Sequence, residues 1–216
     1  MTVLYNDDVC VVCLKPAGVL SEDKGDACVP ALLRQTLGKP VWPVHRLDRA
    51  VGGVMVYSVN EAWTGRLSQA LSDSGEKTYL AVAAGETAES GTFRDLLYHD
   101  PRVNKTFVVQ RQRKGVREAA LDYVTCGRAQ TDGETLSLVR VRLHTGRTHQ
   151  IRVQFASRGM PLAGDRRYGS RIASPVALWS CAVSFIHPKT GQTVRFSHPA
   201  PDVFPFTLFA LPEENI

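Results

Sequence analysis

Long apolar runs, a cysteine framework and paired histidines are all missing from this sequence of 216 residues. The longest early apolar run, Val9–Leu14, is too short to cross a bilayer or to form the core of a signal peptide. The five cysteines are odd in number and scattered, which favours reduced thiols over a disulfide framework. These absences argue against a membrane protein and against a disulfide-bonded secreted protein. We expect a soluble, cytoplasmic protein with no membrane partner.

The sequence also gives no indication of a metal site. Cys10 and Cys13 have the spacing of half a zinc site, but they lie in an apolar, β-branched run that predicts a strand. Residues three apart in a strand point to opposite faces, so these two thiols cannot bind one ion. The six histidines are dispersed, with no His-x-x-x-His pair. We therefore expect no metal.

Acidic residues are missing from the segment Arg102–Arg117, which carries six basic residues. The segment Arg140–Arg171 carries eight arginines against one acid, Asp165. These segments hold charges of +6 and +7, so the rest of the chain must carry −8 to give the net charge of +5. Clustered Arg and Lys side chains supply most of the non-specific affinity of nucleic-acid-binding proteins. The asymmetry favours a nucleic-acid partner, and an ordinary solvated face is the alternative.

Hydrophobic periodicity predicts a small number of helices. One has Pro30 in its first turn and ends at Gly38. A second begins after Asn60, which is a favourable N-cap residue. A third is expected to be capped by Thr148 and to end at Gly159.

Strands account for most of the remaining regular structure. A polar connection is expected after Gly85, through Gly91. Because strands outnumber helices and short turns join many of them, we expect an α+β fold with a mixed, largely antiparallel sheet flanked by helices. No repeat or low-complexity linker interrupts the chain, so a single compact unit is expected. The predicted strands are 9–14, 54–57, 77–82, 106–109, 121–126, 136–143, 176–185 and 193–196.

The stretch Val44–Arg49 holds one carboxylate, Asp48, between the guanidinium groups of Arg46 and Arg49. Gly52-Gly53 follows, so the stretch is predicted to be a loop that leads into a strand. The two arginines favour the charged form of Asp48, which makes it a poor proton donor but a suitable nucleophile or base. A solvated cluster of surface ion pairs is the alternative for these residues taken alone.

A second polar segment, Thr145–Arg152, leads into the third predicted helix. Arg152 lies near the start of that helix and off its apolar face, where a positive charge interacts unfavourably with the helix dipole. This local cost indicates that a partner holds Arg152, and Asp48 is the natural candidate.

Taken together, these segments resemble the RluA-type pseudouridine synthases over nearly the whole chain. The resemblance implies a pseudouridine-synthase-type catalytic domain that spans residues 1–216, has no separate N-terminal RNA-binding domain and needs no cofactor. A monomer is our default expectation. The matching residues are Val3–Asp7 and Lys15–Gly18 for the family's opening, His45–Asp48 for its catalytic motif, Lys77–Tyr79 for its second motif, and Thr145–Arg152 with Gly164-Asp165 and Tyr168-Gly169 for its third.

The resemblance also implies a reaction, in which uridine in ribosomal or transfer RNA is isomerised to pseudouridine. Asp48 would be the catalytic aspartate, either attacking the sugar or assisting glycal formation. Tyr79 would stack on the target base, and Arg152 would pair with Asp48. Arg46 would enter the RNA where the flipped nucleotide has left the stack, and Leu178 would pack at the pocket. Four further motif residues are candidates for substrate binding: His45, Arg49, Lys77 and Arg147.

Two positions depart from the family's pattern. After the aspartate the family commonly has Thr-Ser-Gly, whereas this chain has Val51-Gly52-Gly53 and loses two hydroxyls that brace the loop. The position usually held by His after the pocket leucine is Trp179. Neither change touches the atoms proposed to react, so we expect effects on loop rigidity and substrate choice.

Two other functions fit part of the sequence. A non-catalytic RNA-binding protein that has kept the fold would have no use for a carboxylate that faces phosphates, so Asp48, Tyr79 and Arg152 argue against it. A glycosidase or N-glycosylase would need a second carboxylate as general acid, and the sequence offers no convincing partner. An RNA pseudouridine synthase is therefore the leading hypothesis.

Overall fold

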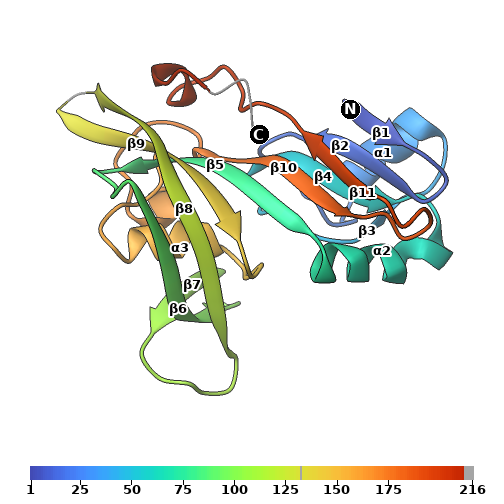
Figure 1. Cartoon of the computed structure of the whole chain (residues 1–216), viewed down its shortest axis with the longest axis horizontal. Coiled ribbons are helices and arrows are strands. Elements are labelled where there is room, and N and C mark those ends of the chain that lie inside the picture. The colour runs from blue at the N-terminus through green and yellow to red at the C-terminus, as the bar shows by residue number, and fades with distance from the viewer. Residues whose placement is uncertain (132, 212–216) are drawn as a thin grey trace. The chain divides into compact units, whose positions relative to one another are not determined.

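The computed structural model describes residues 1–131 and 133–211 (Figure 1). Contacts between residues divide the chain into two compact units. Unit 1 holds Met1–Lys77 and Trp179–Pro199, and unit 2 holds Thr78–Leu178 and the described residues from Ala200 onward. Two of the passages between units fall inside strands, β5 (Glu76–Ala84) and β10 (Leu178–Ile186).

Unit 1 is built on a mixed sheet with the strand order β1–β2–β4–β10. Strand β2 pairs antiparallel with both of its neighbours, whereas β4 and β10 are parallel. Two more strands extend this sheet, because β11 pairs with β10 and the short β3 pairs with β4. The remaining elements are β1 (Val3–Asn6), β2 (Cys10–Lys15), α1 (Val29–Leu37), β3 (Trp42–Pro43), β4 (Gly52–Ser58), α2 (Glu61–Asp73) and β11 (Thr193–Ser197).

Strand β4 is buried on both faces, which makes it a firm support for the loop that precedes it. Val54 and Val56 pack in one apolar cluster with Leu67 of α2. Met55 and Tyr57, which alternate with them and point to the opposite face, are also fully buried. A continuous apolar run is what a strand covered on both sides requires.

Two helix ends in unit 1 lie where the sequence predicts them. Asn60 caps α2, since its side chain accepts a hydrogen bond from the N–H of Ala62 at 3.0 Å. Helix α1 ends at Gly38, which has a left-handed backbone with φ of 68° and donates its N–H to the carbonyl of Arg34. Both ends are set by the residues at the boundary, so tertiary packing did not override them.

Unit 2 holds the strand order β5–β9–β8–β6–β7. Its pairs β6–β7, β6–β8 and β8–β9 are all antiparallel. The predicted polar connection after Gly85 is present but ends before Gly91, because β6 begins at Ser90, and β6 itself was not among the predicted strands. That strand has one buried face, with Phe93 and Leu97, and a more exposed one. The bounds are β6 (Ser90–Asp100), β7 (Lys105–Val109), β8 (Val116–Thr131) and β9 (Glu134–Leu143), followed by α3 (Gln150–Ala156) and the short 3-10 helices η1 (Arg166–Tyr168) and η2 (Phe206–Leu208).

Helix α3 covers one face of the unit 2 sheet. Val153 of the helix packs with Leu97 of β6 and Ala119 of β8. Phe155 lies edge-on to Phe93, with ring centroids 5.0 Å apart. Leu97 and Ala119 therefore define the face of β6 and β8 that lies under α3, and the residues that alternate with them along each strand point away from it.

The start of α3 differs from the prediction. The N-cap is His149, not Thr148, and His149 has a left-handed backbone with φ of 54°. Tertiary contacts explain the change. The carbonyl of Thr148 accepts the Thr106 hydroxyl at 2.8 Å, and Nδ1 of His149 lies 2.9 Å from the Tyr168 hydroxyl. The capping preference of threonine is weaker than these two contacts together.

The α+β class and the mixed, largely antiparallel pairing agree with the prediction. No helix within residues 1–131 and 133–211 is both long enough and apolar enough to cross a membrane.

The two departures from the family's pattern are coupled in space. Gly52 of β4 and Trp179 of β10 are register partners. A Cβ atom added at Gly52 would lie 2.6 Å from Cζ3 of Trp179 and 3.0 Å from the carbonyl oxygen of Lys15. The indole thus occupies the space that a side chain at position 52 would need, so a tryptophan at 179 requires a glycine at 52.

We expect Gly52→Ser alone to lower the free energy of unfolding by about 1–3 kcal/mol, because it overpacks this contact. The double variant Gly52→Ser/Trp179→His should recover most of that loss, since the smaller ring leaves room for the hydroxyl. Urea unfolding of wild type, both single variants and the double variant measures the coupling. Costs that simply add would show that the two positions are independent.

Candidate active site

Asp48 lies in a turn whose main chain is held on both sides. The carbonyl of Leu47 accepts the hydroxyl of Ser21 at 2.9 Å. The carbonyl of Arg49 accepts the N–H of Gly18 at 2.7 Å. The half-buried Asp48 carboxylate is therefore carried by a backbone with little freedom to move.

A buried lysine completes the support of this turn. Lys15 is fully buried, and its Nζ donates to the carbonyls of Pro16 at 3.0 Å, Arg49 at 3.2 Å and Val51 at 2.6 Å. The three donors of an ammonium group are matched to three acceptors. Burial lowers the pKa of Lys15 to about 8, and the negative charge of Asp48 acts in the opposite direction. Sequence reasoning assigned Lys15 no role, because its partners are backbone carbonyls that leave no pattern in the sequence.

Replacing Lys15 should change how folding stability depends on pH. The folded chain has a Lys15 pKa of about 8, and the unfolded chain has one of about 10.4. The unfolded chain binds more protons between these values, so wild type gains stability there as pH rises. Relative to Lys15→Met, wild type should gain up to about 1.4 kcal/mol per pH unit above about pH 8, and nothing below it.

Urea unfolding at a series of pH values measures this difference. Lys24→Met is the matched control, because Lys24 is exposed and pairs with Glu22 at the surface. A difference between wild type and Lys15→Met that is flat across this range would contradict the burial of a charged lysine.

His45 ties the turn to β4. Its Nε2 accepts the N–H of Val56 at 3.0 Å, so the ring proton of the neutral side chain is assigned to Nδ1. Burial, followed by the ammonium group of Lys77, lowers the pKa of His45 to about 3. The imidazole is therefore neutral at physiological pH and acts as a support for the turn. Contact between His45 and RNA stays a prediction.

The two arginines next to Asp48 have contacts of their own. Nη1 of the exposed Arg46 lies 3.2 Å from the carboxylate of Glu22. Nε of Arg49 donates to the carbonyl of Gly18 at 2.8 Å. Both side chains brace the segment that precedes α1, and binding of RNA by either one stays a prediction. Lys77 is partly buried, which lowers its pKa.

In unit 2, Arg152 is held by a carboxylate, as its position in the helix predicts, but this carboxylate belongs to Asp165. Nε and Nη2 of Arg152 donate to Oδ2 and Oδ1 of Asp165 at 2.6 and 2.8 Å. The two residues are 5% and 1% exposed. Such a buried, bidentate pair fixes the plane of the guanidinium group. The pairing of Arg152 with Asp48, which belongs to unit 1, stays a prediction.

Tyr168 packs against the same guanidinium group. Its ring centroid lies 5.2 Å from Cζ of Arg152. Its hydroxyl accepts the N–H of Thr106 at 2.9 Å and lies 2.9 Å from Nδ1 of His149. Asp165 and Tyr168 thus orient Arg152 from two directions. Both residues belong to the third motif, but sequence reasoning gave neither of them a role.

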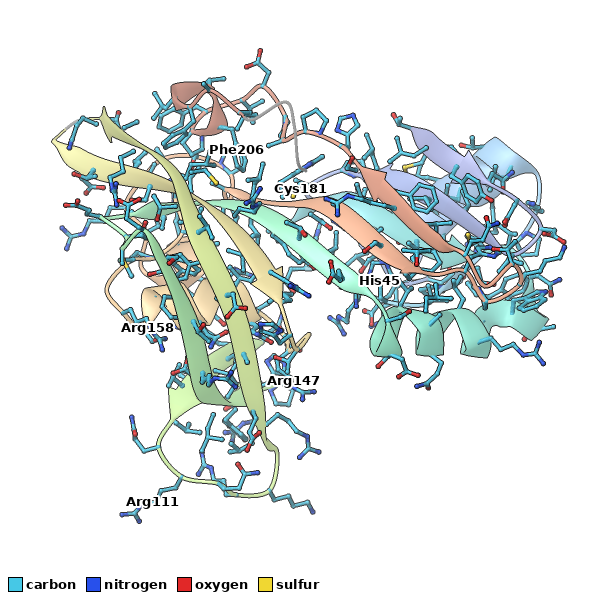
Figure 2. All side chains as sticks on the ribbon, in the orientation of Figure 1. His45, Arg111, Arg147, Arg158, Cys181 and Phe206 are labelled. Carbon is cyan, nitrogen blue, oxygen red and sulfur yellow. The ribbon has the colours of Figure 1, made fainter. Side chains whose placement is uncertain are left out.

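Hydrogen bonds of the Gln150 side chain hold the loop before α3 in place. Its Oε1 accepts the Thr145 hydroxyl at 2.7 Å and the N–H of Arg147 at 3.0 Å, while its Nε2 donates to the carbonyl of Ala120 at 3.0 Å. Nε of the exposed Arg147 donates to the carbonyl of Glu118 at 3.0 Å (Figure 2). Arg147, a predicted substrate-binding residue, therefore has a main chain and an Nε that are held by hydrogen bonds, and its side chain is exposed.

Tyr79 and Leu178 lie in unit 2 at the ends of strands that pass between the units. Each is 6% exposed. The N–H of Val82 donates to the carbonyl of Ala177 at 3.0 Å, which links β5 to the residue before Leu178. Stacking of Tyr79 on a base and packing of Leu178 at a pocket stay predictions. The candidate residues thus divide into Asp48, His45, Arg46, Arg49 and Lys77 in unit 1, and Tyr79, Arg147, Arg152 and Leu178 in unit 2.

A basic loop connects β7 to β8, and β6 lies between these two strands in the sheet. This loop carries Arg111, Arg113 and Lys114, all exposed, and Arg111 lies at the outer end of the loop (Figure 2). Cζ of Arg113 lies 4.8 Å from the ring centroid of Tyr98 on β6. Most of the loop's positive charge is thus presented to solvent.

Asp7, Cys10 and His187 bring potential metal ligands within 4.8 Å of one another. Nδ1 of His187 faces the N–H groups of Lys189 and Thr190 at 3.4 and 3.3 Å, so the ring proton lies on Nε2, which is 3.1 Å from Asp7. Burial, followed by the charge of Asp7, raises the pKa of the Cys10 thiol to about 12. A metal ion bound here would have to displace both of these protons.

Comparison with known proteins identifies the family. The family model described as RNA pseudouridylate synthase matches residues 9–157. Ribosomal large subunit pseudouridine synthase D of Xanthomonas campestris is 31% identical, over 100% of this chain and 70% of the relative. The tRNA pseudouridine synthase C of Haemophilus ducreyi is 29% identical, over 91% of this chain and 90% of the relative.

A solved structure has the same fold. Human RNA pseudouridylate synthase domain containing 1 superposes with a TM-score of 0.80 at 21% identity, covering 94% of this chain and 84% of the human one. This likeness confirms the predicted fold class. Together with the family match and the sequence relatives, it shows that the chain belongs to the RNA pseudouridine synthase family, whose members are RNA isomerases.

Proposed function

We propose that this chain isomerises uridine in ribosomal or transfer RNA to pseudouridine, with Asp48 as the catalytic carboxylate. The observation that carries the proposal is the turn around Asp48, whose main chain is tied by Lys15, Ser21 and Gly18. An ionised carboxylate on a fixed backbone is suited to attack at an anomeric carbon. A carboxylate that only takes part in a surface ion pair does not need a backbone fixed in this way.

The reaction needs few groups. The bond between N1 of the base and C1′ of the ribose breaks, the base turns, and C5 bonds to C1′ while the C5 hydrogen leaves. Asp48 either attacks C1′ or removes a ribose proton to give a glycal. Tyr79 stacks on the base, Leu178 packs beside it, and Arg152 pairs with Asp48. The bidentate contact with Asp165 supports the role of Arg152, because it holds the guanidinium group in one orientation.

The substrate class rests on the relatives. One relative is named for the large ribosomal subunit and another for transfer RNA, so either RNA is a candidate here. The exposed cations of the loop between β7 and β8 and the exposed Arg147 supply contacts for its phosphates. Arg46, Arg49, His45 and Lys77 are proposed to bind the RNA near Asp48, and the two units are proposed to form one catalytic domain.

Tritium release tests this function. RNA that carries tritium at C5 of its uridines loses this tritium to water only when C5 becomes bonded to the ribose. Wild type should release tritium from ribosomal or transfer RNA that is labelled in this way and comes from cells that lack the protein. Binding without release would favour the non-catalytic RNA-binding protein, and release of free uracil would favour an N-glycosylase.

A further inference from the structure

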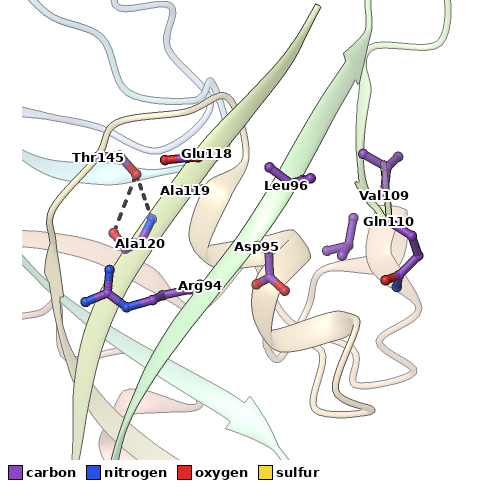
Figure 3. Close-up of a pocket in the computed structure, with 10 residues that line it drawn as sticks. Arg94, Asp95, Leu96, Val109, Gln110, Glu118, Ala119, Ala120 and Thr145 are labelled. Atoms are coloured by element: carbon purple, nitrogen blue, oxygen red, sulfur yellow. Dashed lines mark hydrogen bonds between the residues drawn. The ribbon is translucent and has the colours of Figure 1, made fainter. Parts of the chain in front are cut away.

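The face of β6 and β7 that points away from α3 carries an apolar strip. Leu96 of β6 pairs with Val109 of β7, and on the same face Tyr98 pairs with Phe107. Leu96 lies between residues that point toward α3, and in Figure 3 Leu96 and Asp95 point to opposite sides of β6. Phe107 is 40% exposed. We call these four residues the apolar strip.

A groove of about 650 Å³ adjoins one end of the apolar strip (Figure 3). Its lining includes Leu96 and Val109 from the strip, with Arg94 and Glu118 beside them. Asp95 also contributes to the lining, but its carboxylate is taken by Gln154 and Arg158. A volume of this size accommodates a nucleotide base with its ribose.

The surroundings of the strip are cationic. Cζ of Arg113 lies 4.8 Å from the ring centroid of Tyr98, and Nζ of Lys105 lies 5.7 Å from that of Phe107. Residues 102–117 contain no acid, which leaves Glu118 as an exposed acid beside the strip. Exposed aromatic rings next to Arg and Lys side chains form the kind of surface on which unpaired bases stack and phosphates are neutralised.

Lys105 links the strip to the candidate catalytic residues of unit 2, which lie on the α3 side of the sheet. Nζ of Lys105 lies 5.7 Å from the centroid of Phe107 and 5.4 Å from that of Tyr168, so one ammonium group connects the two rings. Tyr168 in turn packs on Arg152. At the groove end, Arg147 donates to the carbonyl of Glu118, which lines the groove.

From these contacts we infer that the apolar strip and its groove bind an unpaired segment of the substrate RNA, with one base stacked on Phe107 and its phosphates on Arg113 and Lys105. The inference rests on the proposed function and adds to it a contact surface for the RNA, on the face of the unit 2 sheet that points away from α3. Bases inside a duplex are stacked on each other and cannot reach an aromatic ring on a sheet.

Fluorescence anisotropy with two labelled RNAs tests the inference. One is a hairpin with a uridine-rich loop, and the other is a fully paired duplex of matching length. Phe107→Ala should weaken binding of the hairpin by roughly 5- to 100-fold and leave the duplex within about twofold, because the lost contact is a stack on one base. Phe107→Tyr should restore wild-type affinity. Arg113→Gln should lower the slope of log affinity against log salt by about one for the hairpin.

Val124→Ala is the matched control. Val124 is 44% exposed on the neighbouring strand and pairs with Ser90, eight positions along β6 from Tyr98, or about 27 Å away. It should bind both RNAs as wild type does. Thermal unfolding of each variant verifies that it is folded.

The outcomes separate this inference from the proposed function. Tritium release by wild type together with unchanged hairpin affinity in Phe107→Ala would overturn the inference and leave the function standing. Equal losses of affinity for hairpin and duplex would overturn the inference as well. So would sedimentation that shows wild type as a dimer and Phe107→Ala as a monomer, because the strip would then be a contact between two copies of the chain. Selective loss on the hairpin without tritium release from any RNA would support the strip and count against the function.

Discussion

Asp48→Asn is expected to reduce pseudouridine formation by about 10³-fold or more. The amide keeps the shape of the carboxylate but is neither a nucleophile nor a base. The turn should survive, because its main chain is held by Lys15 and Ser21 and not by the Asp48 side chain alone. RNA affinity should therefore stay within a few-fold of wild type. Single-turnover tritium release and anisotropy on the same RNA measure the two quantities.

Asp202→Asn provides the control for a change of charge, since Asp202 is exposed. It should leave both turnover and affinity as they are. Parallel losses of turnover and affinity in Asp48→Asn would instead make Asp48 a binding or folding residue, and the proposed reaction would lose its central group.

Asp165→Asn is expected to lower the free energy of unfolding by about 3–5 kcal/mol, because it removes the buried carboxylate that accepts two hydrogen bonds from the Arg152 guanidinium group. An exposed pair of the same geometry gives the comparison. Arg34 donates to both oxygens of Asp23 at 2.7 and 2.9 Å, but these side chains are 38% and 46% exposed. Asp23→Asn should therefore cost only about 0–1 kcal/mol. Urea unfolding of both variants gives the ratio.

The double variant Arg152→Met/Asp165→Leu should be more stable than Asp165→Asn, since it removes both charges and fills the space with apolar atoms. It should nevertheless be inactive, because the guanidinium group is gone. Equal costs at Asp165 and Asp23 would mean that burial adds nothing to this pair.

The parts of the fold that depend on nearby residues could be predicted from the sequence. The cap at Asn60 and the stop at Gly38 act within one turn of a helix. Strand β6 was not predicted, and its beginning at Ser90 and Gly91 carries the small polar residues that are typical of loops. Its pairing with β8 gives these residues a strand conformation that their own propensities disfavour.

Contacts between distant residues limited the prediction of the site. Charge in the motifs indicated correctly that Arg152 has a carboxylate partner, but the choice between Asp48 and Asp165 depends on packing. The role of Lys15 depends on carbonyl groups, which every residue possesses. The link between Gly52 and Trp179 joins two strands far apart in the sequence, and each change looked like an isolated departure.

Anchoring of Asp48 through main-chain carbonyls has a consequence for how this protein tolerates mutation. Lys15 contacts the carbonyls of Arg49 and Val51, and these groups are present whatever side chain stands at those positions. Neighbours of the carboxylate can therefore be exchanged over evolutionary time without displacing it, as the loss of both hydroxyls after Asp48 illustrates. Substitutions at Arg46, Arg49 and Val51 can therefore change which RNA is bound and leave the carboxylate in place. A substitution at Lys15 would remove the hydrogen bonds that hold the turn.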